Sequence, residues 1–304
     1  SALAAEMIPD PKAPAGSAGA LAAEGGTRSA QAFDAYLRGR ALYDLSADEA
    51  SERAALARFD AAIAADPDYA PAHAARARSL TAIANQYGKA GQLQELYESA
   101  IESAQRAIEI APGLADAYST LGFTLFQGKL DARGARAPFE RSRELGAGEA
   151  TVLARYAQYS ARVGRQQDAV AAIQRALLLD KLNPLIHRAA GAIEYAARDY
   201  RASIPPTRQA LQMNPQMSRA HAAIGDVKSA RDAFAKIEQE GARLHYQQAQ
   251  VLSQWGQLDA AIVRLQQARI IGDSGLVYAR NDPLLDPLRG DPRFAVMLES
   301  ISFE

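Results

Sequence analysis

The sequence predicts an all-α protein in which pairs of helices stack side by side as a solenoid. Three observations support this fold class. Alanine is abundant and aromatic residues make up only 7% of the 304 residues, a composition that favours helices over strands. Val, Ile and Thr do not cluster into the period-2 patterns that are typical of strands. One pattern of small and large residues also returns along the chain at a fixed interval, which is the signature of a repeat protein.

The repeat is clearest between residues 135 and 210, where equivalent positions are 34 residues apart. The second helix of each pair carries a small residue, a larger one four positions later, and another small one three positions after that. Successive repeats show this pattern at Ala135, Phe139 and Ser142, at Ala169, Ile173 and Ala176, and at Ser203, Thr207 and Ala210. Related patterns begin at Ala55, Ala100, Ala230 and Ala261. Together they predict about seven helix pairs.

The first helices of the pairs carry a second pattern, in which an aromatic residue or histidine precedes a glycine by four positions. It occurs at Tyr118 and Gly122, at His187 and Gly191, and at His221 and Gly225. The large residue fills space between helices, and the glycine lets a facing helix approach closely. Turns between the helices of a pair are indicated at Gly91-Gln92, Gly164-Arg165, Arg198-Asp199 and Gly256-Gln257.

Some repeats depart from the regular step. An insertion near Ala84–Gln94 lengthens the second repeat. In the fifth repeat, Pro205 and Pro206 fall inside the expected second helix, and we expect them to delay its start or to kink it. The sixth repeat is short, because few residues separate Gly225 from Ala230.

The two ends of the chain do not follow the repeat. Residues 1–30 are rich in Pro, Gly, Ala and Ser and predict a linker or loosely ordered arm, so the solenoid and its cap span residues 31–304. Residues 272–304 contain several Asp-Pro pairs, which predict short helices separated by Asp-Pro stops that cap the apolar end of the stack. The chain begins at Ser1 rather than methionine, and we expect any anchor or targeting segment of the parent protein to lie upstream.

Over residues 33–271, the quoted positions resemble the tetratricopeptide repeat family. The resemblance implies a right-handed superhelical solenoid of about seven helix-turn-helix repeats with a C-terminal helical cap. It also implies that the first helices line a concave groove that binds peptides or helices. Two end segments, 35–43 and 276–294, resemble those of arrays in bacterial winged-helix transcriptional regulators and class III adenylate cyclases. This second resemblance implies a regulatory part of a larger bacterial protein.

Charge and composition disfavour several function classes. The 34 basic and 35 acidic residues give a net charge of −1 and are spread along the chain, so no long-range field attracts nucleic acid or an anionic membrane. No apolar run is long enough to span a bilayer. The absence of cysteine removes disulfides, thiolate nucleophiles and cysteine-based metal sites. It fits either the cytoplasm or the periplasm.

The four histidines are the obvious candidates for a metal or acid–base site. All four, His73, His187, His221 and His245, fall at the same early position of a first helix. One packing role explains them, and stacked repeats hold equivalent residues on the order of 10 Å apart, too far to share one zinc ion. Carboxylates beside prolines are explained by capping and turns. Because no nucleotide-binding or hydrolase motif is present, we expect no catalytic residues, no cofactor and no metal site.

The candidate partner-binding groove consists of side chains on the solvent side of the first helices. They are Arg78, Asn85, Phe123, Phe126, Gln158, Arg162, Arg188, Tyr195, Arg243, Tyr246 and Gln250. Arginines supply planar donors for carboxylates, and aromatic rings supply rigid apolar anchors. A clamp for chaperone C-terminal tails is rejected, because its Lys and Asn positions hold residues such as Leu37, Ala41, Ala74 and Ser119.

The leading hypothesis is a protein-interaction module that recognises a protein or peptide partner, as the regulatory or sensory arm of a bacterial regulator. One alternative is an accessory domain of a catalytic protein, such as a nucleotide cyclase or a glycosyltransferase, whose enzyme core lies outside this chain. Another is self-association through the ends of the array.

Overall fold

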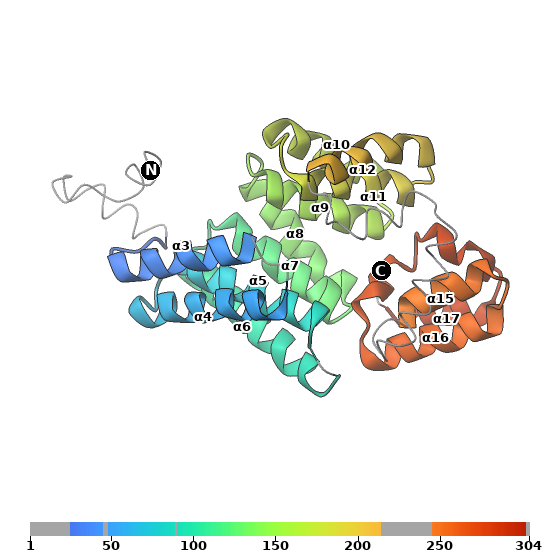
Figure 1. Ribbon diagram of the computed structural model, residues 1–304, viewed down its shortest axis with the longest axis horizontal. Coiled ribbons are helices and arrows are strands. Elements are labelled where there is room, and N and C mark those ends of the chain that lie inside the picture. The colour runs from blue at the N-terminus through green and yellow to red at the C-terminus, as the bar shows by residue number, and fades with distance from the viewer. Residues whose placement is uncertain (1–24, 45–47, 89, 214–244, 302–304) are drawn as a thin grey trace. The chain divides into compact units, whose positions relative to one another are not determined.

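The computed structural model describes residues 25–44, 48–88, 90–213 and 245–301, and within these ranges all regular structure is helical. The chain divides into two compact units, residues 1–121 and 122–304. In each unit, consecutive helices lie side by side as pairs joined by short turns (Figure 1). No helix in the described ranges is long and apolar enough to cross a membrane. The predicted all-α helical-repeat architecture is confirmed.

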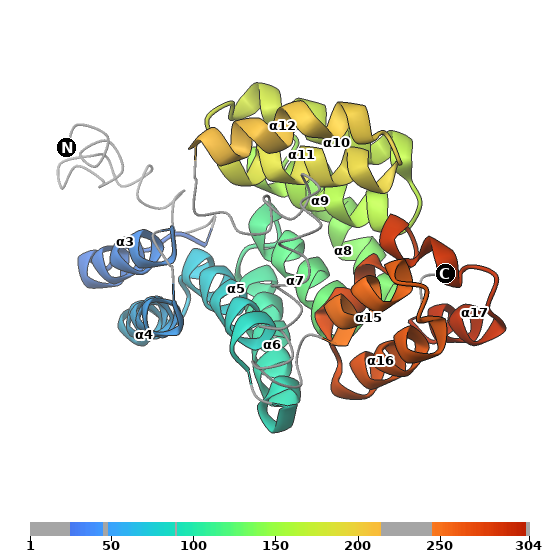
Figure 2. The same cartoon turned by 45° about the vertical axis from the view of Figure 1, so that its right-hand side comes forward.

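The first unit contains two complete helix pairs and the start of a third. The pairs are α3 (Ala30–Asp44) with α4 (Glu49–Ala65) and α5 (Ala70–Gln86) with α6 (Leu93–Ile110), followed by α7 (Ala115–Gly128). Figure 2 shows both pairs from a second direction. A short 3-10 helix, η1 (Ala90–Gln92), lies in the predicted insertion. Ala55, Phe59 and Ala62 of α4 are fully buried, as the small–large–small pattern predicts.

The second unit continues the same arrangement and ends in a different kind of structure. Its helices are α8 (Ala132–Leu145), α9 (Ala150–Arg162), α10 (Gln166–Leu179), α11 (Pro184–Ala196), α12 (Tyr200–Met213), α15 (His245–Gln254) and α16 (Leu258–Ile271). The tail forms two 3-10 helices, η2 (Ser274–Tyr278) and η3 (Pro283–Leu288), and the short helix α17 (Pro292–Glu299). The predicted sixth repeat lies outside the described residues.

The glycines of the first helices lie where the second helices approach. A Cβ atom added at Gly122 of α7 would lie 2.9 Å from the ring of Phe139 in α8, and one added at Gly191 of α11 would lie 2.1 Å from Oγ1 of Thr207 in α12. Phe139 and Thr207 are equivalent positions, two 34-residue steps apart. The glycine of the first-helix pattern and the large residue of the second-helix pattern therefore contact each other within one helix pair.

Two expectations about proline are revised. The helix α12 begins at Tyr200 and runs through Pro205 and Pro206, so its start is not delayed. In the tail, Asp-Pro pairs begin helices: the carboxylates of Asp282 and Asp291 accept hydrogen bonds from backbone N–H groups two residues later, with proline at the first helical position. Proline fits that position because the N–H it lacks has no partner within the helix.

The predicted arm, residues 1–30, lies largely outside the described residues, and its character stays a prediction. Its last residues contact the segment that joins α4 to α5. The carbonyl of Gly25 accepts a hydrogen bond of 3.0 Å from the N–H of Ala70, and the hydroxyl of Thr27 donates to the carboxylate of Asp66.

Candidate peptide-binding groove

Four of the predicted groove residues come together in the second unit. One small cavity is lined by Phe123 and Phe126 of α7, Gln158 and Arg162 of α9, and Tyr278 of η2. The volume of this cavity is about 10 Å³, roughly the space that a single water molecule requires. A segment from the C-terminal part of the same chain therefore lies against four of the residues predicted to line a groove. We call this segment, residues 274–289, the return segment.

Arg162 is the most deeply buried charged group of this cavity, with only 5% of its surface exposed. Its guanidinium lies over the ring of Tyr278, 4.1 Å from the ring centroid. Its Nε has no hydrogen-bond partner among the described residues. A cation–π contact in a desolvated place stabilises by about 2 kcal/mol, but an unpaired buried donor remains costly. The site therefore holds a cation whose Nε is not matched by an acceptor from the described part of the chain.

The return segment is also tied to the end of α9. The side-chain amide of Asn281 donates hydrogen bonds to the carbonyl oxygens of Ala161 and Arg162, at 2.6 and 3.1 Å. These carbonyls belong to the last turn of the helix, where backbone acceptors lack partners within the helix. Asn281 thus acts as a C-terminal cap supplied from 120 positions later in the chain.

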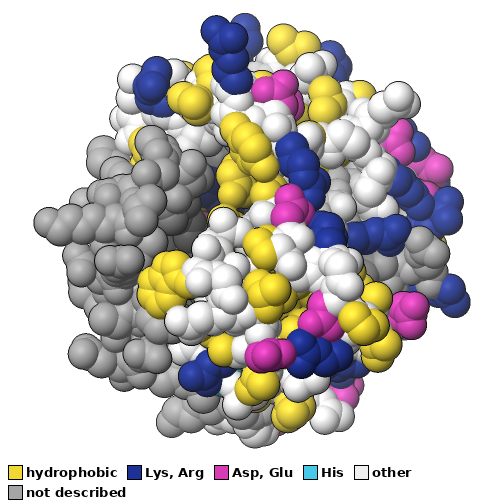
Figure 3. Space-filling view, turned by 90° about the vertical axis from the view of Figure 1, so that its right-hand side faces the viewer, with side chains coloured by type: hydrophobic (Ala, Val, Ile, Leu, Met, Phe, Trp, Pro, Cys, Tyr) yellow, Lys and Arg dark blue, Asp and Glu magenta, His cyan; other side chains and the backbone are white. Residues whose placement is uncertain are grey.

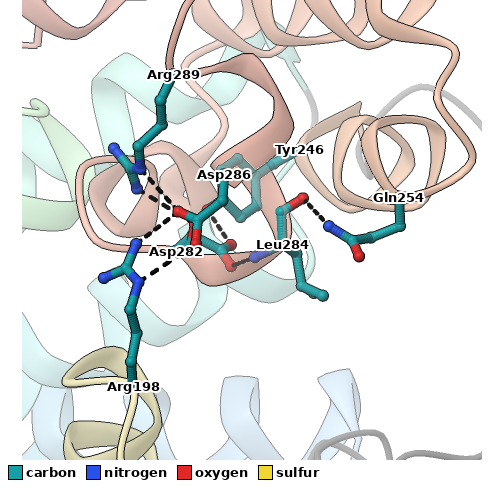
Figure 4. Close-up of polar contacts among 7 residues, drawn as sticks. All are labelled: Arg198, Tyr246, Gln254, Asp282, Leu284, Asp286 and Arg289. Atoms are coloured by element: carbon teal, nitrogen blue, oxygen red, sulfur yellow. Dashed lines mark hydrogen bonds and ion pairs between the residues drawn. The ribbon is translucent and has the colours of Figure 1, made fainter.

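The helix α15 also contacts η3 and the residue before it, and Figure 4 shows two of the α15 side chains involved, Tyr246 and Gln254. The hydroxyl of Tyr246 and the amide of Gln250 both donate to Oδ2 of Asp282, each at 2.5 Å. The amide of Gln254 donates to the carbonyl of Leu284 at 2.8 Å. Burial, and next the neighbouring carboxylate of Asp282, raise the pKa of Tyr246 well above its usual value. Tyr246 therefore remains a hydrogen-bond donor at physiological pH.

Arg198, in the turn after α11, pairs with the other carboxylate of the return segment. Its Nη2 lies 2.5 Å from Oδ1 of Asp286 and its Nε lies 3.3 Å from Oδ2 (Figure 4). Arg289 contributes a further ion pair of 2.8 Å to Asp286. Partial burial alone would raise the pKa of Asp286, but the hydrogen bonds from the two guanidinium groups lower it below its usual value. Burial, and next Asp282, raise the pKa of nearby Tyr195 to about 12.

The remaining predicted residues do not join this cavity. In the first unit, Arg78 forms a 3.6 Å ion pair with Asp116, and the amide oxygen of Asn85 accepts from the hydroxyl of Tyr97 at 2.6 Å. Arg188 lies half-buried on α11. Arg243 lies outside the described residues.

The residues that the sequence patterns missed are those of the return segment and Arg198. The sequence shows that Asn281, Asp282 and Asp286 belong to a tail outside the repeats, but it does not show the contacts of this tail with α9 and Arg198. Arg198 had one signal, since it stands 34 residues after Gly164 in the same kind of turn.

Two histidines have equivalent structural contacts. Nε2 of His73 donates to the carbonyl of Pro67, and Nε2 of His187 donates to the carbonyl of Lys181, both at 2.9 Å and both six residues back. His245 instead lies near the side chain of Gln248, with Nδ1 and Oε1 3.2 Å apart. Among the described residues, no group of three or more His, Asp or Glu side chains is placed to hold a metal ion.

On the face shown in Figure 3, basic and acidic side chains of the described residues are interspersed with hydrophobic ones. This mixture agrees with the nearly balanced net charge of −1. The expectation that this part of the protein binds neither nucleic acid nor membrane stays a prediction.

No protein-family model matches the chain, and a search of curated sequences finds no match. Solved structures do match. TTC0263, a thermophilic tetratricopeptide-repeat (TPR) protein in Thermus thermophilus, is 19% identical, with a TM-score of 0.51 over 64% of this chain and 98% of its own. Human IFIT1, in a dimer with m7Gppp-AAAA, is 16% identical, with a TM-score of 0.57 over 89% of this chain and 67% of its own. Such likeness concerns the fold alone. The chain has a tetratricopeptide-like helical-repeat fold, as its 34-residue pattern predicts.

Proposed function

We propose that this chain is a protein-interaction module that binds a peptide segment in the groove of its second unit. The observation that carries the proposal is the way in which this groove holds an irregular segment. The helix α9, the turn after α11 and the helix α15 contact the return segment through a guanidinium–ring stack, a two-point ion pair and side-chain amides. These are the contacts by which proteins select carboxylates, carbonyls and aromatic rings of a peptide.

Arg162 supports the proposal independently of the ion pairs. A buried guanidinium whose Nε has no partner in the described part of the chain is poorly explained by stability alone, because replacing a buried charge by an apolar residue is often neutral or stabilising. It is well explained as an anchor for a carboxylate or carbonyl oxygen of a ligand. The guanidinium of Arg162 lies over the Tyr278 ring.

The wider role that we propose is the regulatory or sensory arm of a larger bacterial signalling or transcription-regulator protein. It rests on the resemblance of the two end segments to those of such arrays. A winged-helix domain encoded upstream of Ser1 would agree with this role, whereas an upstream cyclase or transferase core would make the chain an accessory domain of an enzyme.

The binding proposal is tested by probing an array of about 15-residue peptides with the full chain and with an Arg162→Leu variant. We expect retained peptides to contain carboxylates and leucines. We expect the variant to bind them at least tenfold more weakly, a loss of about 1.4 kcal/mol. Arg208→Leu is the matched control, because Arg208 is exposed on α12 and does not line the cavity.

Two results would contradict the proposal. One is an array on which no peptide is retained by the wild-type chain. The other is equal binding by the wild-type chain and the Arg162→Leu variant, with circular dichroism showing that both are folded.

A further inference from the structure

The helix α11 packs against both α10 and α12 (Figure 2). An open groove of about 440 Å³ lies between these three helices, and we call it the α11 groove. Ligand pockets commonly have volumes of about 300–1,000 Å³ and a lining that is mostly apolar with a few polar groups. The α11 groove shares no lining residue with the cavity at Arg162. Its apolar lining consists of Ile173, Leu177, Ala190, Ala202, Pro205 and Pro206.

Glu194 of α11 brings a carboxylate to this groove. Burial, and next the carboxylate of Asp199, raise the pKa of Glu194 above its usual value, and no cation among the described residues offsets this shift. No lysine or arginine of the described chain lines the groove. A cation supplied by a ligand would therefore stabilise the ionised carboxylate, and it would do so more strongly in this partly buried place than in bulk water.

The prolines of α12 leave a backbone acceptor beside the same groove. In an α-helix, the N–H of each residue donates to the carbonyl four positions earlier. Pro205 and Pro206 have no N–H, so the carbonyls of Arg201 and Ala202 cannot receive these hydrogen bonds. Because Ala202 and Pro206 both line the groove, the carbonyl of Ala202 lies at its wall. A helical carbonyl without its regular donor favours a ligand that supplies one.

The carboxylate and the carbonyl lie on neighbouring helices at the same level. Arg198 is in the turn that joins α11 to α12. Glu194 stands four residues before Arg198 and Ala202 stands four residues after it. The two antiparallel helices therefore place these residues beside each other, so one cationic group with several N–H donors can bind both acceptors.

Exposed apolar side chains continue from the other end of the groove, where His187 lies. Nε2 of His187 donates to the carbonyl of Lys181, in the turn between α10 and α11, at 2.9 Å. The next residue in this turn, Leu182, is 81% exposed, and Leu185 at the start of α11 is 56% exposed. Large apolar side chains that are exposed beside a groove indicate contact with another polypeptide.

We infer that the α11 groove binds a basic peptide segment of a partner protein. An arginine or lysine of this segment pairs with Glu194 and donates to the carbonyl of Ala202, and its leucine-like side chains pack on Leu177, Ala190 and Pro205. The inference goes beyond the proposed function, because it assigns a second site. The ligand at this site has the opposite charge to the ligand expected at Arg162.

The test measures peptide affinity by fluorescence anisotropy with the full chain. The probes are fluorescent peptides of about 12 residues that combine arginines with leucines at different spacings, and the same peptides with glutamate in place of every arginine. We expect the wild-type chain to bind arginine peptides and to bind their glutamate counterparts at least fivefold more weakly. This factor corresponds to a partly exposed ion pair of ordinary strength.

Glu194→Gln removes the charge and keeps the shape of the side chain. We expect this variant to bind the arginine peptides about fivefold more weakly than the wild-type chain does. It should melt no lower than the wild-type chain, because the carboxylate has no cationic partner to lose. Glu144→Gln is the matched control. Glu144 pairs with Arg141 on the surface of α8, outside the groove, and its replacement should leave peptide affinity at the wild-type value.

Pro206→Ala tests the backbone acceptor through two readouts that change in opposite directions. Alanine restores an N–H for the carbonyl of Ala202, so we expect a higher melting temperature than that of the wild-type chain. The same hydrogen bond removes the acceptor from the ligand, so we expect binding of the arginine peptides to weaken about threefold. A proline with a purely structural role would change the melting temperature without weakening the binding.

Three results would overturn the inference: no binding of arginine peptides by the wild-type chain, equal affinity for arginine and glutamate peptides, or equal affinity in the wild-type chain and Glu194→Gln. Arginine peptides whose binding depends on Arg162 but not on Glu194 would also overturn it. None of these results contradicts the proposed function, which depends on the binding of carboxylate-containing peptides and on the contribution of Arg162 to it.

Discussion

Gly122 of α7 lies directly against the ring of Phe139 in α8. A Cβ atom at position 122 would lie 2.9 to 3.1 Å from three atoms of the Phe139 ring, and that ring is fully buried and stacked on Tyr159 at 4.6 Å. The ring has little freedom to move away, because buried side chains are close-packed.

Gly122→Ala is therefore expected to lower the free energy of unfolding by about 1–3 kcal/mol, the usual cost of overpacking a core. Urea denaturation followed by circular dichroism measures the change. Gly113→Ala serves as the control, because no neighbouring atom lies within 4 Å of an added Cβ, and it should leave stability unchanged or raise it slightly. A Gly122→Ala variant as stable as the wild-type chain would show that the helices can separate at little cost.

We expect the stability of the first unit to depend on pH through His73. Burial, together with the nearby cations Arg106 and Arg76, lowers its pKa, against the opposing effects of the bond to Pro67 and of Asp68. The unfolded chain therefore takes up a proton that the folded chain does not, once the pH falls below about 6.5. The stability that neutral His73 contributes is present above this pH and is lost as the pH falls through the lower, folded-state pKa.

We expect the melting temperature to fall between pH 7.5 and pH 5 in the wild-type chain, and to fall less in a His73→Gln variant. Glutamine keeps a donor for the carbonyl of Pro67 but does not titrate. Differential scanning calorimetry at both pH values makes the comparison. An identical shift in both chains would assign the pH dependence to other groups.

At the scale of elements, the N-terminus of α8 depends on one carboxylate. Oδ1 of Asp131 accepts a hydrogen bond of 2.7 Å from the backbone N–H of Gly134. We expect Asp131→Ala to destabilise the protein by about 1 kcal/mol, whereas Asp131→Asn retains an acceptor and costs little. Thermal denaturation of the two variants measures the difference. Equal losses would show that the charge of Asp131, rather than its acceptor, stabilises α8.

The helices themselves were largely predictable, because their packing pattern repeats every 34 residues. Ala169, Ile173 and Ala176 are buried on α10 as expected. The path of α12 through Pro205 and Pro206 was not predictable from local propensity. Packing along one face, including buried Thr207 and Ala210, holds this helix together despite the missing N–H groups, as tertiary context often does.

At the scale of the whole molecule, the repeats could be predicted and the return segment could not. Repeat patterns describe contacts between neighbouring units, and they place Phe123, Phe126, Gln158 and Arg162 on a common surface. They contain no information about a segment that returns to α9 from 120 residues away. That contact depends on single side chains such as Asn281. In the sequence, this asparagine has the features of an ordinary turn residue, so nothing indicates a distant partner.

The long reach of Asn281 has a consequence for folding kinetics. Arrays of helix pairs form mostly contacts that are close in sequence, and such proteins fold fast. The hydrogen bond from Asn281 to Ala161 closes a loop of about 120 residues. The chain loses conformational entropy when this loop closes, and the hydrogen bond stabilises the protein only after that loss. We therefore expect the contacts of the return segment with α9 and with Arg198 to form late, after the helix pairs, whose contacts are mostly local.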